Sequence, residues 1–151
     1  MTKEVFVRVI GLQTAVNDVE DNDNEPIEVV YTGTYYFKNG KHYVFYEEAT
    51  EGVPGVTKTQ IRWQKDGVLE VIRKGISNSH MIFEKNERHT CDYQTPFGTL
   101  NIGILTKRIS WKEEENLFDI SAEYNMDVDW ELAAKCMIKI NVQPRSEKIV
   151  L

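Results

Sequence analysis

The sequence predicts an all-β fold, a single antiparallel and mostly up-and-down β-barrel. Apolar and polar residues alternate with a period of two through most segments, which is the pattern of half-buried strands. Asn39-Gly40 and Asp66-Gly67 separate strand-like runs in the manner of β-hairpin turns. No segment has the helical spacing and length that a crossover between parallel strands requires, so neighbouring strands are expected to be antiparallel.

Ten segments, joined mainly by short hairpins, are expected as strands. The first precedes an acidic loop at residues 17–26, and the next two flank Asn39-Gly40, whose residues both tolerate the positive φ of a type I′ turn. A loop rich in glycine and proline at residues 49–56 then leads to a second hairpin around Asp66-Gly67, and five more alternating segments follow. The expected strands cover residues 4–15, 27–37, 42–48, 57–64, 68–75, 79–84, 89–94, 99–111, 116–128 and 132–142.

Closure into a barrel follows from the edges of such a meander. Two free edge strands would pair with other chains, and a closed barrel removes them. A two-sheet sandwich is the alternative, but it usually needs longer connections between its sheets than this chain offers. We therefore favour the barrel.

Length and charge limit the class of protein. The 151 residues suit one domain, residues 1–151, and a net charge of −6 without a basic patch opposes nucleic-acid binding. Residues 1–11 carry Glu4 and Arg8 within an apolar run, unlike a secretory signal, and no stretch is long enough for a membrane helix. We therefore expect a cytoplasmic protein in which Cys91 and Cys136 are two buried thiols rather than a disulfide.

No metal-binding or catalytic motif is complete. Residues 21–32 imitate a calcium loop, but Pro26 stands where glycine is needed and Thr32 where a bidentate glutamate is needed. His89 and Cys91 share a strand face, yet they supply two ligands where zinc requires at least three. The sequence therefore predicts no catalytic residue, no metal and no cofactor.

The register of the hairpin around Asp66 follows from its side chains. A three-residue loop, Lys65 to Gly67 with Gly67 left-handed, places apolar residues opposite each other, whereas a two-residue loop would place Trp63 opposite Glu70. The predicted pairs are Gln64 with Val68, Trp63 with Leu69, Arg62 with Glu70, Ile61 with Val71 and Thr59 with Arg73. One face is then expected to be buried, with Ile61, Trp63 and Val71, and the other exposed, with Lys58, Gln60 and Arg62.

In this register Arg73 points into the barrel. A buried guanidinium needs a carboxylate, carbonyl groups or a ligand anion as its partner. Glu47-Glu48 supplies a carboxylate, because consecutive strand residues face opposite sides and one of the two must point inward. Two interpretations stay open: an internal ion pair, or an arginine that orients an acidic ligand.

The residues expected around such a ligand are those placed on the inner face together with the candidate partners of the arginine. They are Arg73, Glu48, Glu47, Tyr46, Thr59, Trp63, Tyr93 and Tyr124, with Tyr31 and Tyr35 as further interior hydroxyls.

Several short motifs follow one another along the chain in a defined order. They are Gly33 to Tyr36 before the Lys38-Asn39-Gly40 turn, Tyr43 to Glu48, Arg73 with Gly75, Met81 with Phe83, and Tyr93 to Gly98 leading to Thr106. In this order and spacing the chain resembles the YwiB-like family of bacterial proteins over nearly its whole length. The resemblance implies a calycin-type β-barrel, related in architecture to lipocalins and fatty-acid-binding proteins. That family has no established activity, so the resemblance transfers no catalytic residue.

Three classes of function remain open. The first is a barrel that binds a small amphipathic or acidic ligand, with Arg73 neutralising the acid group. The second is a structural or protein-interaction module whose barrel is filled by its own side chains. The third, which we favour least, is an enzyme that uses Arg73, a glutamate and a tyrosine as polar catalysts. An interior void lined by Arg73 and aromatic rings would support the first or third class, and a filled interior would support the second.

Overall fold

Ten antiparallel strands make up the part of the chain that the structure, a computed structural model, describes: residues 3–15, 25–49 and 51–145. They are β1 (Lys3–Ala15), β2 (Ile27–Lys38), β3 (Lys41–Ala49), β4 (Val56–Trp63), β5 (Leu69–Gly75), β6 (Ser79–Phe83), β7 (Arg88–Thr95), β8 (Gly98–Glu114), β9 (Leu117–Val128) and β10 (Glu131–Pro144). All ten expected strands are therefore confirmed. The expected acidic loop at residues 17–26 lies almost entirely outside the described residues. Within those residues no helix is long and apolar enough to cross a membrane.

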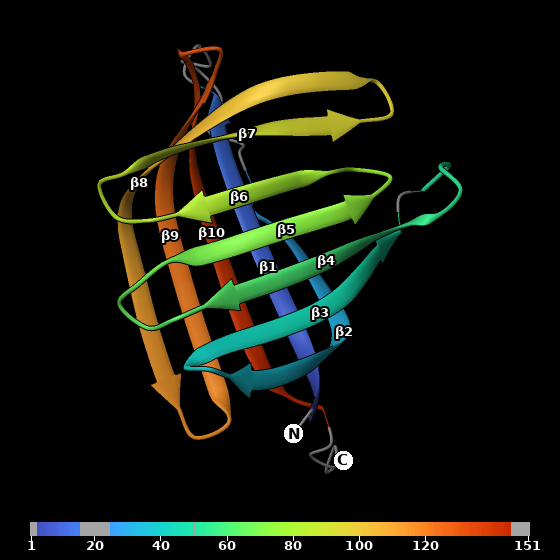
Figure 1. Cartoon of the computed structure of the whole chain (residues 1–151), viewed down its shortest axis with the longest axis vertical. Coiled ribbons are helices and arrows are strands. Elements are labelled where there is room, and N and C mark those ends of the chain that lie inside the picture. Colours follow the sequence, from blue (N-terminus) through green and yellow to red (C-terminus); the bar gives the residue numbers. More distant parts are fainter. Residues whose placement is uncertain (1–2, 16–24, 50, 146–151) are drawn as a thin grey trace.

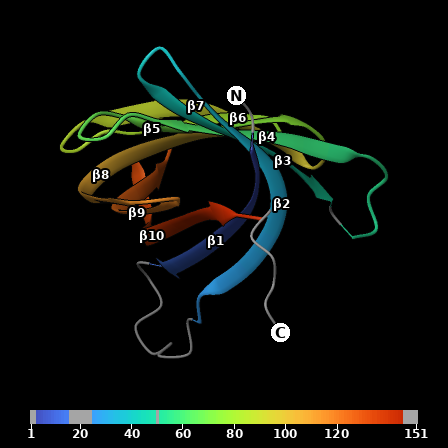
Figure 2. The same cartoon turned by 90° about the horizontal axis from the view of Figure 1, so that it is seen from below.

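The strands form one sheet in which sequence neighbours are also neighbours in space. Its order is β6-β5-β4-β3-β2-β1-β10-β9-β8-β7. The first and last strands of the sequence, β1 and β10, therefore pair, from Val5 with Pro144 to Ala15 with Ala134. Figure 1 shows β4 to β7 crossing over β1, β9 and β10, and Figure 2 shows the sheet curving round the interior. The seam lies between β6 and β7, where Asn78 and Gln94 exchange two backbone hydrogen bonds of 2.9 and 2.8 Å. The fold is a nearly closed up-and-down barrel, as expected, and the sandwich alternative is wrong.

Both hairpin turns lie where the sequence predicts them, and the second differs from the prediction in which residue has positive φ. Asn39 and Gly40 both have positive φ, 54° and 79°, as a type I′ turn requires. In the second hairpin Asp66 has the positive φ, 62°, and the prediction that Gly67 is left-handed is wrong. The Gly67 N–H donates to the carbonyl of Gln64 (2.9 Å), so Asp66 occupies the third position of the turn, where a left-handed residue is common.

The predicted register of β4 and β5 is confirmed from Thr59 with Arg73 to Trp63 with Leu69. Gln64 and Val68 lie just outside both strands, so this predicted pair is not part of the ladder. Ile61, Trp63 and Val71 are buried, and Lys58 is exposed, as expected.

The expected exposure of Gln60 and Arg62 is wrong, because both are half-buried. Arg62 lies along the outer face and donates two hydrogen bonds to Glu70, of 2.7 and 2.9 Å. It also stands opposite Tyr43 of β3, so neighbouring side chains cover part of its stem.

The middle of the barrel is filled by the barrel's own side chains. The least exposed large apolar residues there are Phe83, Ile61, Leu69, Ile104, Ile140, Val7, Val44, Val71 and Val142. Cys91 and Cys136 are both free thiols, as predicted, but only Cys136 is buried, and the expected burial of Cys91 is wrong because it is half-buried. Two ends remain on either side of this core. We call the end with the β1–β2, β3–β4, β5–β6, β7–β8 and β9–β10 connections the loop end, and the opposite end the turn end.

Candidate functional site

An ion pair between Arg73 and Glu48 lies inside the barrel near the loop end. Arg73 comes from β5 and Glu48 from β3, and β4 lies between them with Thr59 opposite Arg73. The Arg73 Nε–H donates to Glu48 Oε2 at 3.0 Å, and the two side chains are 18% and 22% exposed. The expectation that Arg73 faces inward and meets a glutamate is therefore confirmed. Glu48 is the inward residue because its partner, Thr57, shares the inner face with Thr59.

The carboxylate of this pair accepts three hydrogen bonds. Besides Arg73, the Tyr31 hydroxyl donates to Oε1 at 3.1 Å and the Thr59 hydroxyl to Oε2 at 2.5 Å. Arg73, in contrast, donates only through Nε to a described residue, although a guanidinium carries five N–H groups. Within the ion pair, most of the free hydrogen-bonding capacity is therefore donor capacity from the terminal nitrogens of Arg73.

The protonation states of the cluster follow from burial and from the pair itself. Burial alone would raise the pKa of Glu48, but the charge of Arg73 and the three hydrogen bonds outweigh it and hold the pKa below its ordinary value. Burial and the charge of Glu48 raise the pKa of Tyr31 to about 12. Burial also raises the pKa of Tyr46 and of Tyr124. At neutral pH the site therefore holds one carboxylate, one guanidinium and neutral tyrosines.

Aromatic rings lie near the pair, and two buried hydroxyl groups lie on the inner face of the barrel. Tyr31 stacks on Tyr46 with ring centroids 4.4 Å apart, and Tyr124 packs edge-on against Phe83 at 4.9 Å. The hydroxyl oxygens of two buried residues on the inner face, Ser79 and Thr106, have no hydrogen-bond partner among the described residues, and Ser79 stands opposite Arg73. Buried polar groups of this kind usually bond to water or to a ligand.

A cavity of about 540 Å³ opens from this cluster toward the loop end, lined in part by Arg73, Tyr31 and Tyr124. Its wall includes Ile27 and Val29, which share the inner face of β2 with Tyr31 yet are 73% and 40% exposed. A Cβ atom built on Gly11, their neighbour on β1, meets nothing within 4 Å. The barrel is therefore filled in its middle and hollow at the loop end, where a mainly apolar wall, which also carries Gln13 and Glu25, leads to a guanidinium.

The structure brings together most of the residues predicted for the site, but not all. Arg73, Glu48, Tyr46, Thr59 and Tyr124 meet at the loop end, and Tyr93 is partly buried against the hydrophobic core.

Three of the predicted positions lie elsewhere. Glu47 is exposed on the outer face opposite Lys58, because it alternates with Glu48. Trp63 faces inward but lies four residues along β4 from Thr59, roughly 13 Å away at the usual rise of a strand. It stacks on His42 at the turn end, and Tyr35 lies there too.

Sequence reasoning did not select Ile27, Val29, Ser79 and Thr106 for the site. Ile27 and Val29 carry a signal, since they alternate with Tyr31 on β2 and so share its face. No local signal identifies Ser79 and Thr106, because only the three-dimensional structure leaves their hydroxyl groups without partners.

These features define a class of protein, a nearly closed up-and-down β-barrel with a filled middle and a buried ion pair beneath an open cavity. The chain belongs to the family described as "Domain of unknown function (DUF1934)", whose model matches residues 10–140. It is similar to the "Uncharacterized beta-barrel protein YwiB" of Bacillus subtilis (strain 168), with 33% identity over 109 residues, 72% of this chain and 75% of that protein. The crystal structure of the ywiB protein from Bacillus subtilis matches with a TM-score of 0.78 at 25% identity, covering 95% of this chain and 92% of that one. The family expected from the sequence motifs is confirmed.

Proposed function

We propose that the loop-end cavity binds a small amphipathic molecule whose acidic group is directed at Arg73. The observation that carries the proposal is the imbalance of the ion pair: Glu48 accepts three hydrogen bonds, whereas Arg73 uses one donor group. The charged pair therefore has more free donor groups than free acceptor sites, which favours an added acceptor. A carboxylate fits best, because a guanidinium binds it through two parallel N–H groups.

The cavity supports an amphipathic ligand rather than a fully polar one. Ile27 and Val29 expose apolar surface on the inner wall, and covering that surface would stabilise a bound hydrocarbon or aromatic tail. The volume of about 540 Å³ is within the range usual for small-molecule sites, about 300–1,000 Å³. Selectivity for an acid over a neutral molecule would come from Arg73, whose side chain is mostly buried and therefore only weakly screened by water.

A second candidate function has its own supporting observation. The fully buried residues of the middle layer fill the barrel as a self-packed module would. On that interpretation the ion pair is purely structural, and the cavity at the loop end holds only water.

Calorimetric titration with decanoate and with decanol, which differ in charge but share a tail, tests the proposal. Wild-type protein is expected to bind decanoate more tightly than decanol. Arg73→Met, which keeps much of the side-chain volume without the donors, is expected to lose at least tenfold in affinity for decanoate and little for decanol. Arg62→Met is the matched control, because Arg62 forms a similar cross-strand pair on the outer face.

A combined Arg73→Met and Glu48→Met variant removes the unpaired carboxylate and keeps the test valid should the single variant fold poorly. It is expected to bind decanol as wild type does and to have lost the preference for decanoate. Equal affinity of the wild type for acid and alcohol, or no binding of either, would overturn the proposal and favour the self-packed module.

A further inference from the structure

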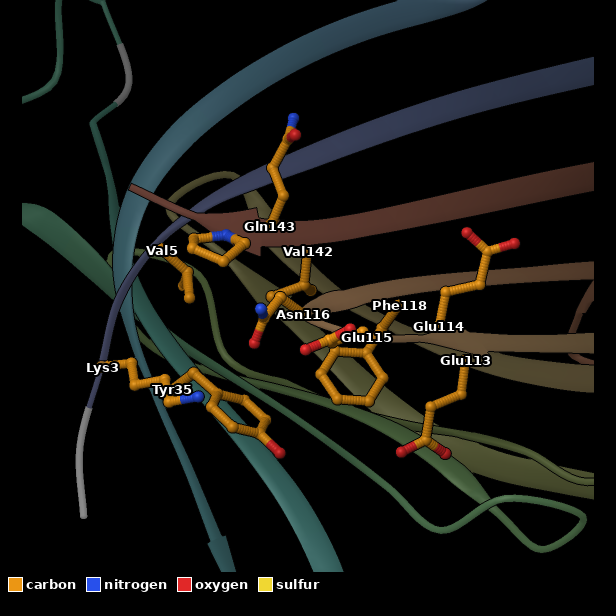
Figure 3. A pocket seen from close by; sticks show the side chains of 11 residues that line it. Lys3, Val5, Tyr35, Glu113, Glu114, Glu115, Asn116, Phe118, Val142 and Gln143 are labelled. Carbon is orange, nitrogen blue, oxygen red and sulfur yellow. The ribbon is translucent and has the colours of Figure 1, made fainter. Parts of the chain in front are cut away.

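A second pocket, of about 410 Å³, opens at the turn end, on the far side of the filled core from Arg73 (Figure 3). It lies where β1, β2 and β10 approach the turn between β8 and β9. Tyr35 and Phe118 stand at its wall, and Lys3, Glu113 and Glu115 stand around it. It shares no lining residue with the loop-end cavity, so the two sites can bind different ligands.

Two aromatic rings, those of Tyr35 and Phe118, form part of the wall of this pocket. The rings of Tyr35 and Phe118 lie 5.4 Å apart, and Phe118 packs edge-on against Trp63 at the same distance. Behind them His42 stacks on Trp63 at 5.1 Å and shares a hydrogen bond of 2.7 Å with the Tyr35 hydroxyl. The two rings that line the pocket are therefore held in place by a buried layer and present an ordered π surface.

Of the glutamates at this pocket, Glu113 is the one that β8 directs to the same face of the sheet as these rings. Glu113 of β8 is directly opposite Phe118 of β9 and alternates with Trp111 on the inner face. Glu114, the next residue, points outward and pairs with Lys112 at 3.4 Å. The sheet thus directs one of two adjacent glutamates to the aromatic wall, much as it directs Glu48 rather than Glu47 inward at the other end.

The charges around the pocket favour a cation. In the described part of the chain, the charged residues that line the pocket are three glutamates and one lysine: Glu113, Glu114, Glu115 and Lys3. Burial lowers the pKa of His42 below its ordinary value although the charge of Glu113 opposes the shift. The imidazole is therefore neutral at neutral pH and supplies no competing positive charge.

We propose that the turn-end pocket is a binding site for a small organic ammonium ion, held over the rings of Tyr35 and Phe118 with Glu113 as its counter-ion. The faces of aromatic rings attract cations, and quaternary ammonium groups are recognised by such rings together with a carboxylate. The site is independent of the acidic ligand proposed for the loop end. The two ends of the barrel then have opposite selectivity, because one offers free donors and the other offers π faces and a carboxylate.

Lys3 provides an internal competitor for this site. It stands opposite Tyr35 in the ladder between β1 and β2, and Figure 3 shows its side chain beside the Tyr35 ring. Its ammonium group therefore repels a cation that binds at the same rings. Removing this charge is expected to strengthen binding of the added ion.

Amide NMR titration of the full chain with tetramethylammonium ion, and with neutral tert-butanol of similar shape, tests the proposal. Tetramethylammonium is expected to shift the resonances of Asn116 and Phe118, and tert-butanol to leave them nearly unchanged. Glu113→Gln is expected to weaken binding about fivefold or more, as the loss of a close counter-ion should. Glu114→Gln, the matched control with the same change of net charge, is expected to weaken it less than twofold, and Lys3→Met to strengthen it.

Three results would overturn the proposal. They are equal shifts with the ion and with tert-butanol, equal weakening by Glu113→Gln and Glu114→Gln, or shifts confined to residues away from the turn end. Arg73→Met, which tests the loop end, is expected to leave tetramethylammonium binding unchanged, so the two proposals fail separately.

Discussion

Replacing Arg73 with Met leaves the Glu48 carboxylate inside the barrel without its counter-ion. Breaking a buried ion pair in this way costs about 3–5 kcal/mol. The two side chains keep 18% and 22% of their exposure, so water compensates in part and the low end, about 3 kcal/mol, is expected. In a chain of 151 residues this corresponds to a fall in Tm of about 6 to 12 °C.

The measurement is a double-mutant cycle followed by thermal melts and by urea unfolding. Arg73→Met, Glu48→Met and the combined variant are compared with wild type, and the combined variant is expected to recover most of the stability lost in Arg73→Met. Arg62→Met on the outer face is the control, with an expected loss of about 1 kcal/mol or less. If Arg73→Met melted like the wild type, or if the two single effects simply added, the charges of Arg73 and Glu48 would not be coupled in the free energy of unfolding.

The same pair predicts a dependence of stability on pH. Because the pKa of Glu48 in the folded protein is below its ordinary value of 4.5, its contribution to stability is present above that value and is lost as the pH falls through the folded pKa. Arg73→Met removes the charge and the hydrogen bond of Arg73, while burial still raises the pKa of the Glu48 carboxyl group and the hydrogen bonds from Tyr31 and Thr59 still lower it. The pKa should therefore be higher than in the wild type, and acid should narrow the stability gap between the two proteins. Urea unfolding between neutral and acidic pH checks this. A gap between the two proteins that widens in acid would contradict it.

Two further predictions concern packing. Trp63→Ala should lower the free energy of unfolding by about 3–5 kcal/mol, because Trp63 is 3% exposed, and a near-neutral urea midpoint would count against its burial. Gly33→Ala should cost about 1–3 kcal/mol, because its Cβ would lie 2.5 Å from the backbone oxygen of Phe45. Gly11→Ala is the matched control, since its Cβ meets open space. Equal melting temperatures for the two glycine variants would contradict the expected clash at Gly33.

Much of the candidate site could be predicted because the relevant pairing is local. The hairpin between β4 and β5 has a short turn, so side-chain matching alone chooses its register and places Arg73 on the face of Ile61. Between β3 and β4 the connection is longer and leaves the register free. For that reason the choice between Glu47 and Glu48 required the structure, in which Thr57 stands opposite Glu48.

The sequence by itself determined the strands and the inward arginine, because alternation and turn chemistry act over a few residues. Only the tertiary structure decided which strands close the barrel, since the ladder from Val5 with Pro144 joins the two ends of the chain. It also decided that Trp63 and Arg73 belong to different ends, although they share a face of one hairpin. A period of two defines the side on which a residue lies but not its depth, and depth depends on how distant strands cross.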